Sequence, residues 1–168
     1  TPLGLHARDG LAMINGSNVI AGMSALIVHD VHCWIKMSEI AAAMTLEVLN
    51  ANMQAYDARI HETRGYPGAL ESAANIRRIT EGSELLERPG KKVQDAYSLR
   101  STPQVVGAVR DALKWARYMI EIELNGAADN PVFFPDEQLV LTGANFQGVP
   151  MALPLELLGT SVTTVAVL

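Results

Sequence analysis

Residues 18–50 read NVIAGMSALIVHDVHCWIKMSEIAAAMTLEVLN, and this stretch decides the fold class of the chain. It contains no proline and one glycine, Gly22, and it is rich in Ala, Met and Leu, which are strong helix formers. Its apolar residues fit helical spacing better than alternation: Val19, Met23, Leu26, Ile27, Ile35, Ile40 and Met44. The stretch therefore predicts one long helix and an all-α protein.

Helical patterns continue on the C-terminal side of this stretch. Residues 70–81 predict a second helix. Residues 102–125 predict a long one with Pro103 in its first turn, where the missing N–H leaves no helical bond unmade. Gly126 then occupies the C-terminal capping position. Residues 148–168 resume an apolar helical pattern. We expect part of a bundle of long helices with irregular polar loops.

Turn-rich polar segments separate these helices. Residues 57–65 form a polar segment that ends at a glycine, and Tyr66-Pro67-Gly68 predicts a turn. Residues 83–92 are charged, contain a Pro-Gly pair and predict an exposed loop. Residues 129–145 predict an irregular segment with a short β-like piece at Val132-Phe133-Phe134. The sequence contains no internal repeat that would indicate a repeat architecture.

The composition limits the classes of partner. Of the 168 residues, 49% are hydrophobic and only 18% are charged, whereas a typical soluble domain has roughly 25% charged residues. The apolar excess must be buried, either in a large core or against partner chains. The net charge of −5 argues against a nucleic-acid or anionic-membrane surface, because both need clustered Lys and Arg.

Location and completeness can also be predicted. The apolar stretches 11–29 and 151–168 are interrupted by polar residues, so buried helices account for them better than membrane spans do. The single Cys33 excludes an internal disulfide and indicates a reducing compartment, which we expect to be the cytoplasm. The chain starts without Met and stops inside an apolar run, so we expect it to continue at both ends.

His29 and His32 share a helix face, with Asp30 and Cys33 beside them, and this cluster raises the question of a metal site. A tetrahedral site would need compatible third and fourth ligands, and no CxxC or HExxH motif is present. We therefore expect no metal, and a buried helix with satisfied histidines and a core thiol. Phosphate-loop, GxGxxG and GxSxG motifs are also absent from the sequence.

Asn15 lies in an Asn-Gly turn between apolar runs, in the segment LAMINGSN (residues 11–18). Apolar neighbours would hold its amide for a fixed hydrogen bond to a ligand. The alternative is an ordinary turn in which Ser17 or Asn18 caps the following helix.

Gln94, Tyr97 and Arg100 recur every three residues in KVQDAYSLR (residues 92–100), so within one or two helical turns they project to one side. An amide, a phenol and a guanidinium suit an amino-acid ligand, because Arg clamps a carboxylate bidentately and Tyr donates or relays a proton. The alternative is a solvated polar face with a surface Arg–Asp pair.

Phe146 lies in the loop GANFQG (residues 143–148), between two glycines. The loop would place this ring either over a planar ligand or in the core.

Five motifs occur in one order along the chain: INGS (14–17), YDARIH (56–61), KVQDAYSLR (92–100), DNP (129–131) and GANFQG (143–148). In this order and with these gaps they resemble the aromatic amino acid ammonia-lyases, the family of the histidine, phenylalanine and tyrosine enzymes, and the related aminomutases. The resemblance covers residues 10 to 150, and KVQDAYSLR is its most specific part.

The resemblance implies a fold, an assembly and a prosthetic group. It implies that residues 1–168 form one segment of a central helical lyase domain, in a homotetramer whose active sites are each built from three subunits. The family's electrophile is a methylidene-imidazolone (MIO), formed autocatalytically from an Ala-Ser-Gly tripeptide. It captures an aromatic amino acid, a base removes a β-proton, and ammonia leaves to give an arylacrylate.

The same resemblance implies roles for six residues. Asn15, as a catalytic residue, would lie beside the prosthetic group and the substrate amine. Arg100 would bind the substrate carboxylate with support from Asn130. Tyr97, as a catalytic residue, and Gln94 would line the site of a neighbouring subunit. A further aromatic residue, Phe146, would pack near the prosthetic group and the substrate.

Two departures from the family pattern limit these implications. The sequence contains no Ala-Ser-Gly, so the chain lacks the N-terminal part that carries the MIO precursor, as well as the C-terminal part, and alone should be inactive. Gln147 stands where histidine lyases often have His, and Ser101 where Cys is common, which weakens an assignment to histidine. Two alternatives remain: an aromatic amino acid aminomutase, and a non-catalytic helical oligomerisation module.

Overall fold

The computed structural model describes residues 2–168, and helices dominate this part of the chain. The elements in chain order are α1 (Asp9–Ile14), α2 (Asn18–Val48), the 3-10 helix η1 (Met53–Tyr56), α3 (Ala58–Arg64), α4 (Pro67–Ile79), α5 (Tyr97–Leu124), β1 (Val132–Phe134), β2 (Leu139–Leu141) and α6 (Val149–Ala166). The expected all-α class is confirmed, and the stretch that predicted a long helix forms α2 almost to its last residue.

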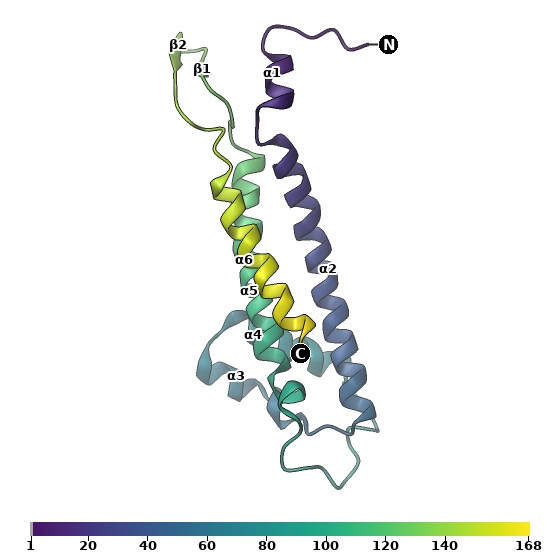
Figure 1. Cartoon of the computed structure of the whole chain (residues 1–168). Helices are drawn as coiled ribbons and strands as arrows, with labels where there is room; N and C mark the ends of the chain where they lie inside the picture. The colour runs from purple at the N-terminus through teal and green to yellow at the C-terminus, as the bar shows by residue number, and fades with distance from the viewer. Residues whose placement is uncertain (1) are drawn as a thin grey trace.

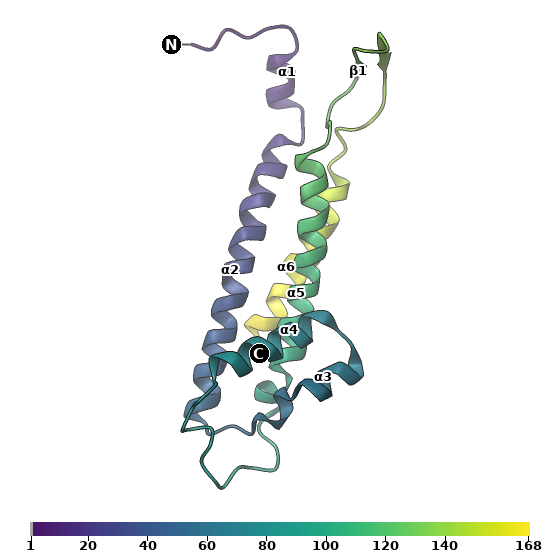
Figure 2. The ribbon, with the colours of Figure 1, turned by 180° about the vertical axis from the view of Figure 1, so that it is seen from behind.

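Three helices run side by side along the long axis of the molecule (Figures 1 and 2). The middle helix, α5, packs against α2, α6 and the shorter α4. Around it lies an apolar cluster of buried residues: Ile35, Val106, Val109, Leu113, Ala116 and Leu158. The chain is therefore a partial bundle organised on α5, with one end formed by α1 and the β1–β2 hairpin and the other by the loop before α5 (Figure 1).

A second apolar cluster lies at the lower end, where α2, η1 and α4 meet: Ala43, Leu46, Ala51, Tyr56 and Ile76. Tyr56 is 1% exposed, and its hydroxyl donates to the carbonyl oxygen of Leu99 at 2.5 Å. Burial raises the pKa of this phenol to about 12. The cluster fixes the short helices against the first turns of α5.

Helices α4 and α5 approach each other closely at two glycines, Gly68 at the start of α4 and Gly107 in α5. A Cβ on Gly68 would lie 2.0 Å from the carbonyl oxygen of Gly107, and a Cβ on Gly107 would lie 2.3 Å from the backbone nitrogen of Ala69. The Gly68 amide also donates to Oδ1 of Asp111, one turn further along α5, at 2.9 Å. Backbone thus packs directly on backbone here, which only glycine allows.

A buried ion pair joins α2 to α5. Arg110 donates from Nε and one terminal nitrogen to the two carboxylate oxygens of Glu39, at 2.8 and 2.7 Å. These side chains are 10% and 3% exposed, respectively. Asn75 of α4 donates to the same carboxylate at 3.0 Å, and Glu71 accepts from Arg110 at 2.5 Å. Three helices therefore share one hydrogen-bonded network.

Two boundary predictions were wrong. Helix α5 begins at Tyr97 rather than at residue 102, so Pro103 lies inside it rather than in its first turn. Tyr66-Pro67-Gly68 is not a turn, since Pro67 occupies the first position of α4. In both places tertiary contacts set the start of the helix. The Tyr56 hydroxyl donates to the carbonyl that Pro103 leaves unpaired, and Gly107 has no side chain, so the first turn of α4 packs directly against α5.

Helix α2 is not the buried helix that the apolar stretch predicted. Its large apolar residues on one side are mostly exposed: Val19, Met23, Leu26, Met37, Met44 and Val48. His29, His32 and Cys33 are exposed as well. Both α2 and α6 are long and apolar enough to cross a membrane, although this weak criterion is also met by soluble helices that pack against others. The apolar excess is therefore buried only in part within this chain.

Candidate active site

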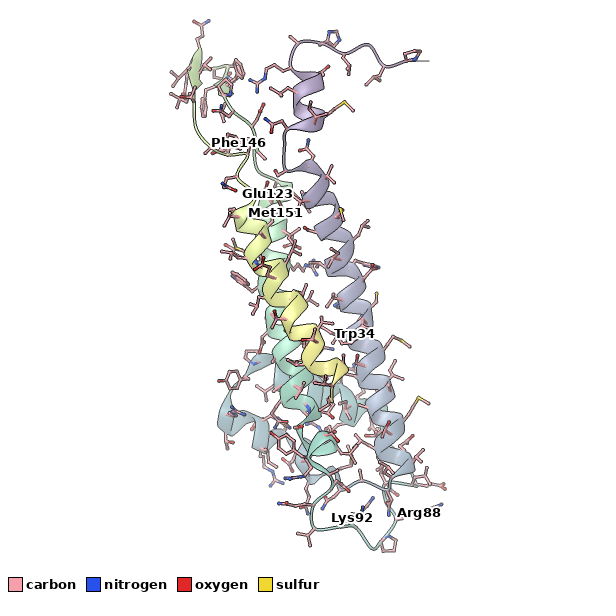
Figure 3. The ribbon with its side chains drawn as sticks, in the orientation of Figure 1. Trp34, Arg88, Lys92, Glu123, Phe146 and Met151 are labelled. Atoms are coloured by element: carbon pink, nitrogen blue, oxygen red, sulfur yellow. The ribbon has the colours of Figure 1, made fainter. Side chains whose placement is uncertain are left out.

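The six candidate residues form two groups at opposite ends of the bundle (Figure 3). Asn15, Asn130 and Phe146 belong to the end where α5 finishes and α6 begins, near the labelled Glu123 and Met151. Gln94, Tyr97 and Arg100 belong to the other end, where the chain enters α5 just after the labelled Lys92. The 28 residues of α5 separate the groups, a distance of about 40 Å at 1.5 Å per residue. Within one chain the structure does not bring the two groups together.

Asn15 is the C-cap of α1, and its backbone N–H donates to the carbonyl of Leu11 at 2.8 Å. Its side chain is exposed and makes no hydrogen bond to other described residues. Two contacts hold the turn that carries it. Ser17 donates to Oε1 of Glu123 at 2.6 Å, and Asn18 donates to the carbonyl of Ala12 at 3.0 Å. Ser17 occupies the N-cap position of α2, as the ordinary-turn alternative expected, but its side chain bonds to Glu123 and not to the backbone of the helix.

Asn130 and Phe146 lie on the two sides of the β1–β2 hairpin. The hairpin is antiparallel and pairs Val132 with Leu141. Beyond it, Oδ1 of Asn130 accepts from the backbone N–H of Gly143 at 2.8 Å, which closes the base of the hairpin. Phe146 follows three residues later and is 45% exposed, so it is not a core residue in this chain. A cleft of about 340 Å³ beside it is lined by Glu123, Asn145 and Gln147, among others.

At the other end, the first turn of α5 carries Tyr97 and Arg100. The Arg100 guanidinium lies 6.0 Å from the centre of the Tyr97 ring, and its Nε donates to the carbonyl of Asp95 at 3.0 Å. Its two terminal nitrogens make no hydrogen bond within residues 2–168. Gln94 precedes the helix instead of continuing it, so the predicted three-residue periodicity holds only for Tyr97 and Arg100. The surface Arg–Asp ion pair considered from the sequence does not form.

The loop before α5 is held by residues that the sequence did not single out. Buried Asp95 accepts from the backbone N–H of Asn52 at 2.6 Å. The Asn52 side chain donates to the carbonyl of Lys92 at 3.0 Å, and Lys91 donates to Oδ1 of Asn50 at 2.5 Å. Asp95 lies within the most specific motif, which was the one available signal. Nothing in the sequence indicated that Asn50 and Asn52 would lie beside it.

A larger cleft, of about 580 Å³, lies between α3, α4 and α5 and contains none of the six candidates. It is lined by Ile60, His61, Arg64, Tyr66, Gln104 and Asp111, among others.

No group of three or more His, Cys, Asp or Glu side chains in the described part of the chain has the arrangement of a metal site. Burial and the nearby cations Lys36, Arg110 and Arg117 lower the pKa of His32.

Known structures define the class of protein to which this fold belongs. The fold matches the tyrosine aminomutase of Streptomyces globisporus with a TM-score of 0.91 and 35% identity, over 99% of this chain and 35% of that one. It also matches the histidine ammonia-lyase of Trypanosoma cruzi, with a TM-score of 0.85 and 32% identity over 98% of this chain and 30% of that one. The arrangement of helices is thus that of the ammonia-lyases and aminomutases.

The family follows from the sequence comparison. The family model described as aromatic amino acid lyase matches residues 1–168, and the chain belongs to this family. It is 43% identical to the histidine ammonia-lyase of Alkaliphilus metalliredigens (strain QYMF) over 166 residues, which are 98% of this chain and 33% of that protein. The chain therefore spans about a third of the length of the curated relatives it matches.

Proposed function

We propose that the protein containing these residues eliminates ammonia from an aromatic L-amino acid, of the histidine, phenylalanine or tyrosine type, to give an arylacrylate. The observation that carries the proposal is the state of the Arg100 side chain. Its Nε is fixed by the carbonyl of Asp95 at 3.0 Å, while its two terminal nitrogens have no partner within residues 2–168. A guanidinium held in this way presents a bidentate edge to a carboxylate.

The other candidates complete a site for an amino acid. Tyr97 is 76% exposed on the same helical turn, where its phenol can donate or relay a proton. At the opposite end, Asn15 offers its amide to the substrate amine and to the prosthetic group, and Asn130 supports carboxylate binding. Phe146 offers an exposed ring face to the aromatic part of the substrate.

The two groups can act together only across subunits, because about 40 Å of helix separates them in one chain. The exposed apolar side chains of α2, which include Met23, Leu26, Met37 and Met44, support an assembly that buries them against other copies. We propose a homotetramer with shared active sites, in which Tyr97 and Gln94 of one subunit line the site of another. We also propose that the protein is a cytoplasmic enzyme with neither a membrane nor a nucleic acid as a partner, which agrees with its similarity to the ammonia-lyases.

The prosthetic group is proposed to come from the part of the protein outside these 168 residues, since the sequence holds no Ala-Ser-Gly. When present, MIO supplies the electrophile that captures the substrate. The residues in this chain suit a position beside MIO. The exposed Asn15 amide has no hydrogen-bond partner within residues 2–168, and Phe146 is exposed at the same end of the bundle. The 168-residue chain alone is therefore proposed to be inactive.

An aminomutase is the second candidate, supported by the match to the tyrosine aminomutase of Streptomyces globisporus. It would use the same residues and add the amine back at the β-carbon. A purely structural oligomerisation module would use the exposed face of α2 but would leave the free edge of Arg100 without a role.

The test is product analysis of the full-length protein with histidine, phenylalanine and tyrosine. Release of ammonia together with an arylacrylate is the expected result. A β-amino acid as the main product would replace the lyase by the aminomutase. No turnover of any aromatic amino acid by a protein that carries the Ala-Ser-Gly tripeptide would leave only the structural role.

A further inference from the structure

Arg8 joins the N-terminal segment to the loop that carries Asn130, although 121 positions separate it from Asp129. One terminal nitrogen of its guanidinium lies 2.7 Å from Oδ2 of Asp129 and 3.1 Å from the carbonyl oxygen of Asn130. The other donates to the carbonyl of Pro131 at 3.3 Å. The guanidinium also lies 5.2 Å from the centre of the Phe133 ring. One side chain thus holds consecutive residues of the loop and the first strand of the hairpin.

The backbone of Arg8 is unusual in a way that agrees with this role. Its φ is 76°, in the left-handed region that residues with a Cβ seldom adopt. Arg8 is the N-cap of α1, and Asp9 accepts from the backbone N–H of His6 at 2.7 Å to complete the turn. An unfavourable backbone conformation persists where surrounding contacts over-determine it. Here these contacts are made by the Arg8 side chain.

The two segments that Arg8 joins each carry a candidate site residue. Helix α1 begins directly after Arg8, and Asn15 is its C-cap residue. Asn130 belongs to the loop whose carbonyls bond to Arg8, and its own Oδ1 accepts from the backbone N–H of Gly143 at 2.8 Å. The guanidinium therefore sets the position of the Asn15 turn relative to the Asn130 loop. Since the Arg8 and Asp129 side chains are 33% and 54% exposed, their ion pair by itself adds little stability, and its main effect is on position.

We propose that Arg8 is a positioning residue, which places the amides of Asn15 and Asn130 relative to each other at the end of the bundle where α5 finishes. This inference rests on the proposed ammonia-lyase function for its catalytic consequence but not for its structural one. Arg8 itself does not touch the substrate; it acts through the loop backbone and through α1.

The experiment uses the full-length protein with Arg8→Ala and Arg8→Lys. Arg59→Ala is the matched control, because it removes an equally charged side chain from an exposed pair, with Asp57, elsewhere on the surface. Two readouts are needed: kcat and KM with the best aromatic amino acid, and amide hydrogen exchange. The informative amide is that of Gly143, because its protection reports whether Asn130 stays in place.

Arg8→Ala is expected to lower kcat by about tenfold to a hundredfold, the effect of a displacement of about 1 Å at a reacting centre, with a smaller change in KM. Exchange should rise at Gly143 and in residues 9–18 and stay unchanged in α5. Arg8→Lys should be intermediate, because an ammonium pairs with Asp129 but has no fork to reach two carbonyls as well. Arg59→Ala should behave like the wild type.

Wild-type exchange at Gly143 in Arg8→Ala would overturn the proposal, whatever the activity. So would increased exchange combined with wild-type kcat. Absence of ammonia release from the wild-type protein would instead contradict the proposed function, and the exchange data would still decide whether Arg8 holds the loop.

Discussion

The hydroxyl of Tyr56 donates to the carbonyl oxygen of Leu99 at 2.5 Å, and this carbonyl is the one that Pro103 leaves without a helical partner. In a regular helix the N–H of residue 103 would bond to the carbonyl of residue 99, but proline has no N–H. The phenol, from a 3-10 helix 43 positions earlier in the chain, replaces that donor. It thereby allows α5 to extend over Pro103 to Tyr97 and Arg100.

Tyr56→Phe should destabilise the 168-residue chain by about 1 to 3 kcal/mol, because it leaves the part-buried Leu99 carbonyl without a donor. Urea unfolding at neutral pH measures the change. Tyr118→Phe is the control, since Tyr118 is 61% exposed and has no hydroxyl partner among the described residues. Equal midpoints for wild type and Tyr56→Phe would show that the bond contributes nothing.

The same phenol predicts a loss of stability at high pH. Burial raises the pKa of Tyr56 to about 12, against about 10 in the unfolded chain. Between these values the unfolded state releases the proton first, so stability is complete below pH 10 and falls as pH rises towards 12. The loss should reach about 2 to 3 kcal/mol for this group. The difference in unfolding free energy between wild type and Tyr56→Phe, measured from pH 9 to 11.5, should shrink; a constant difference would contradict the shift.

Gly107→Ala should destabilise the chain by about 3 kcal/mol or more, because the new Cβ meets rigid backbone of α4 rather than a movable side chain. The nearest atom would be the nitrogen of Ala69 at 2.3 Å. Gly22→Ala in α2 is the matched control, since its Cβ meets nothing within 4 Å, and it should stabilise by about 0.5 to 1 kcal/mol. Thermal unfolding of both variants gives the comparison, and a neutral Gly107→Ala would mean that α4 and α5 can separate without cost.

Arg110→Met should destabilise the chain by about 3 to 5 kcal/mol, because it leaves the Glu39 carboxylate buried without its cation. Asn75 alone would still donate to that carboxylate, at 3.0 Å. Arg117→Met provides the control: its pair with Glu121 is 65% and 54% exposed and should contribute about 0 to 1 kcal/mol. Similar urea midpoints for the two variants would show that the buried network is dispensable.

Arg100→Ala in the full-length protein should lower kcat/KM by the equivalent of about 2 to 4 kcal/mol, through loss of the carboxylate clamp. Steady-state kinetics with the preferred aromatic amino acid measure this. Arg88→Ala removes an exposed charge from the loop at the same end of the molecule (Figure 3) and should leave kcat/KM unchanged. Equal kinetics for both variants would remove Arg100 from the site.

The sequence predicted the long helices well because apolar spacing and helix propensity are local properties. Residues 18–50 contained what was needed to place α2, and the short piece at Val132 was recognised as extended. The start of α5 was missed because proline was interpreted by its local rule alone. Asn52, Asp95 and Arg8 were missed as supports of the site for a related reason, since each acts on a partner more than 40 positions away, which no local pattern reports.

What the sequence determined by itself was the family, the helical class and the six candidate residues, because these depend on motifs in order and on periodicity. Only the tertiary structure decided that Asn15, Asn130 and Phe146 lie at one end of α5 and that Gln94, Tyr97 and Arg100 lie at the other. The physical reason is the rigidity of a 28-residue helix, which holds the two groups about 40 Å apart. That separation and the exposed apolar face of α2 are the two observations that support the proposal of a site shared between subunits.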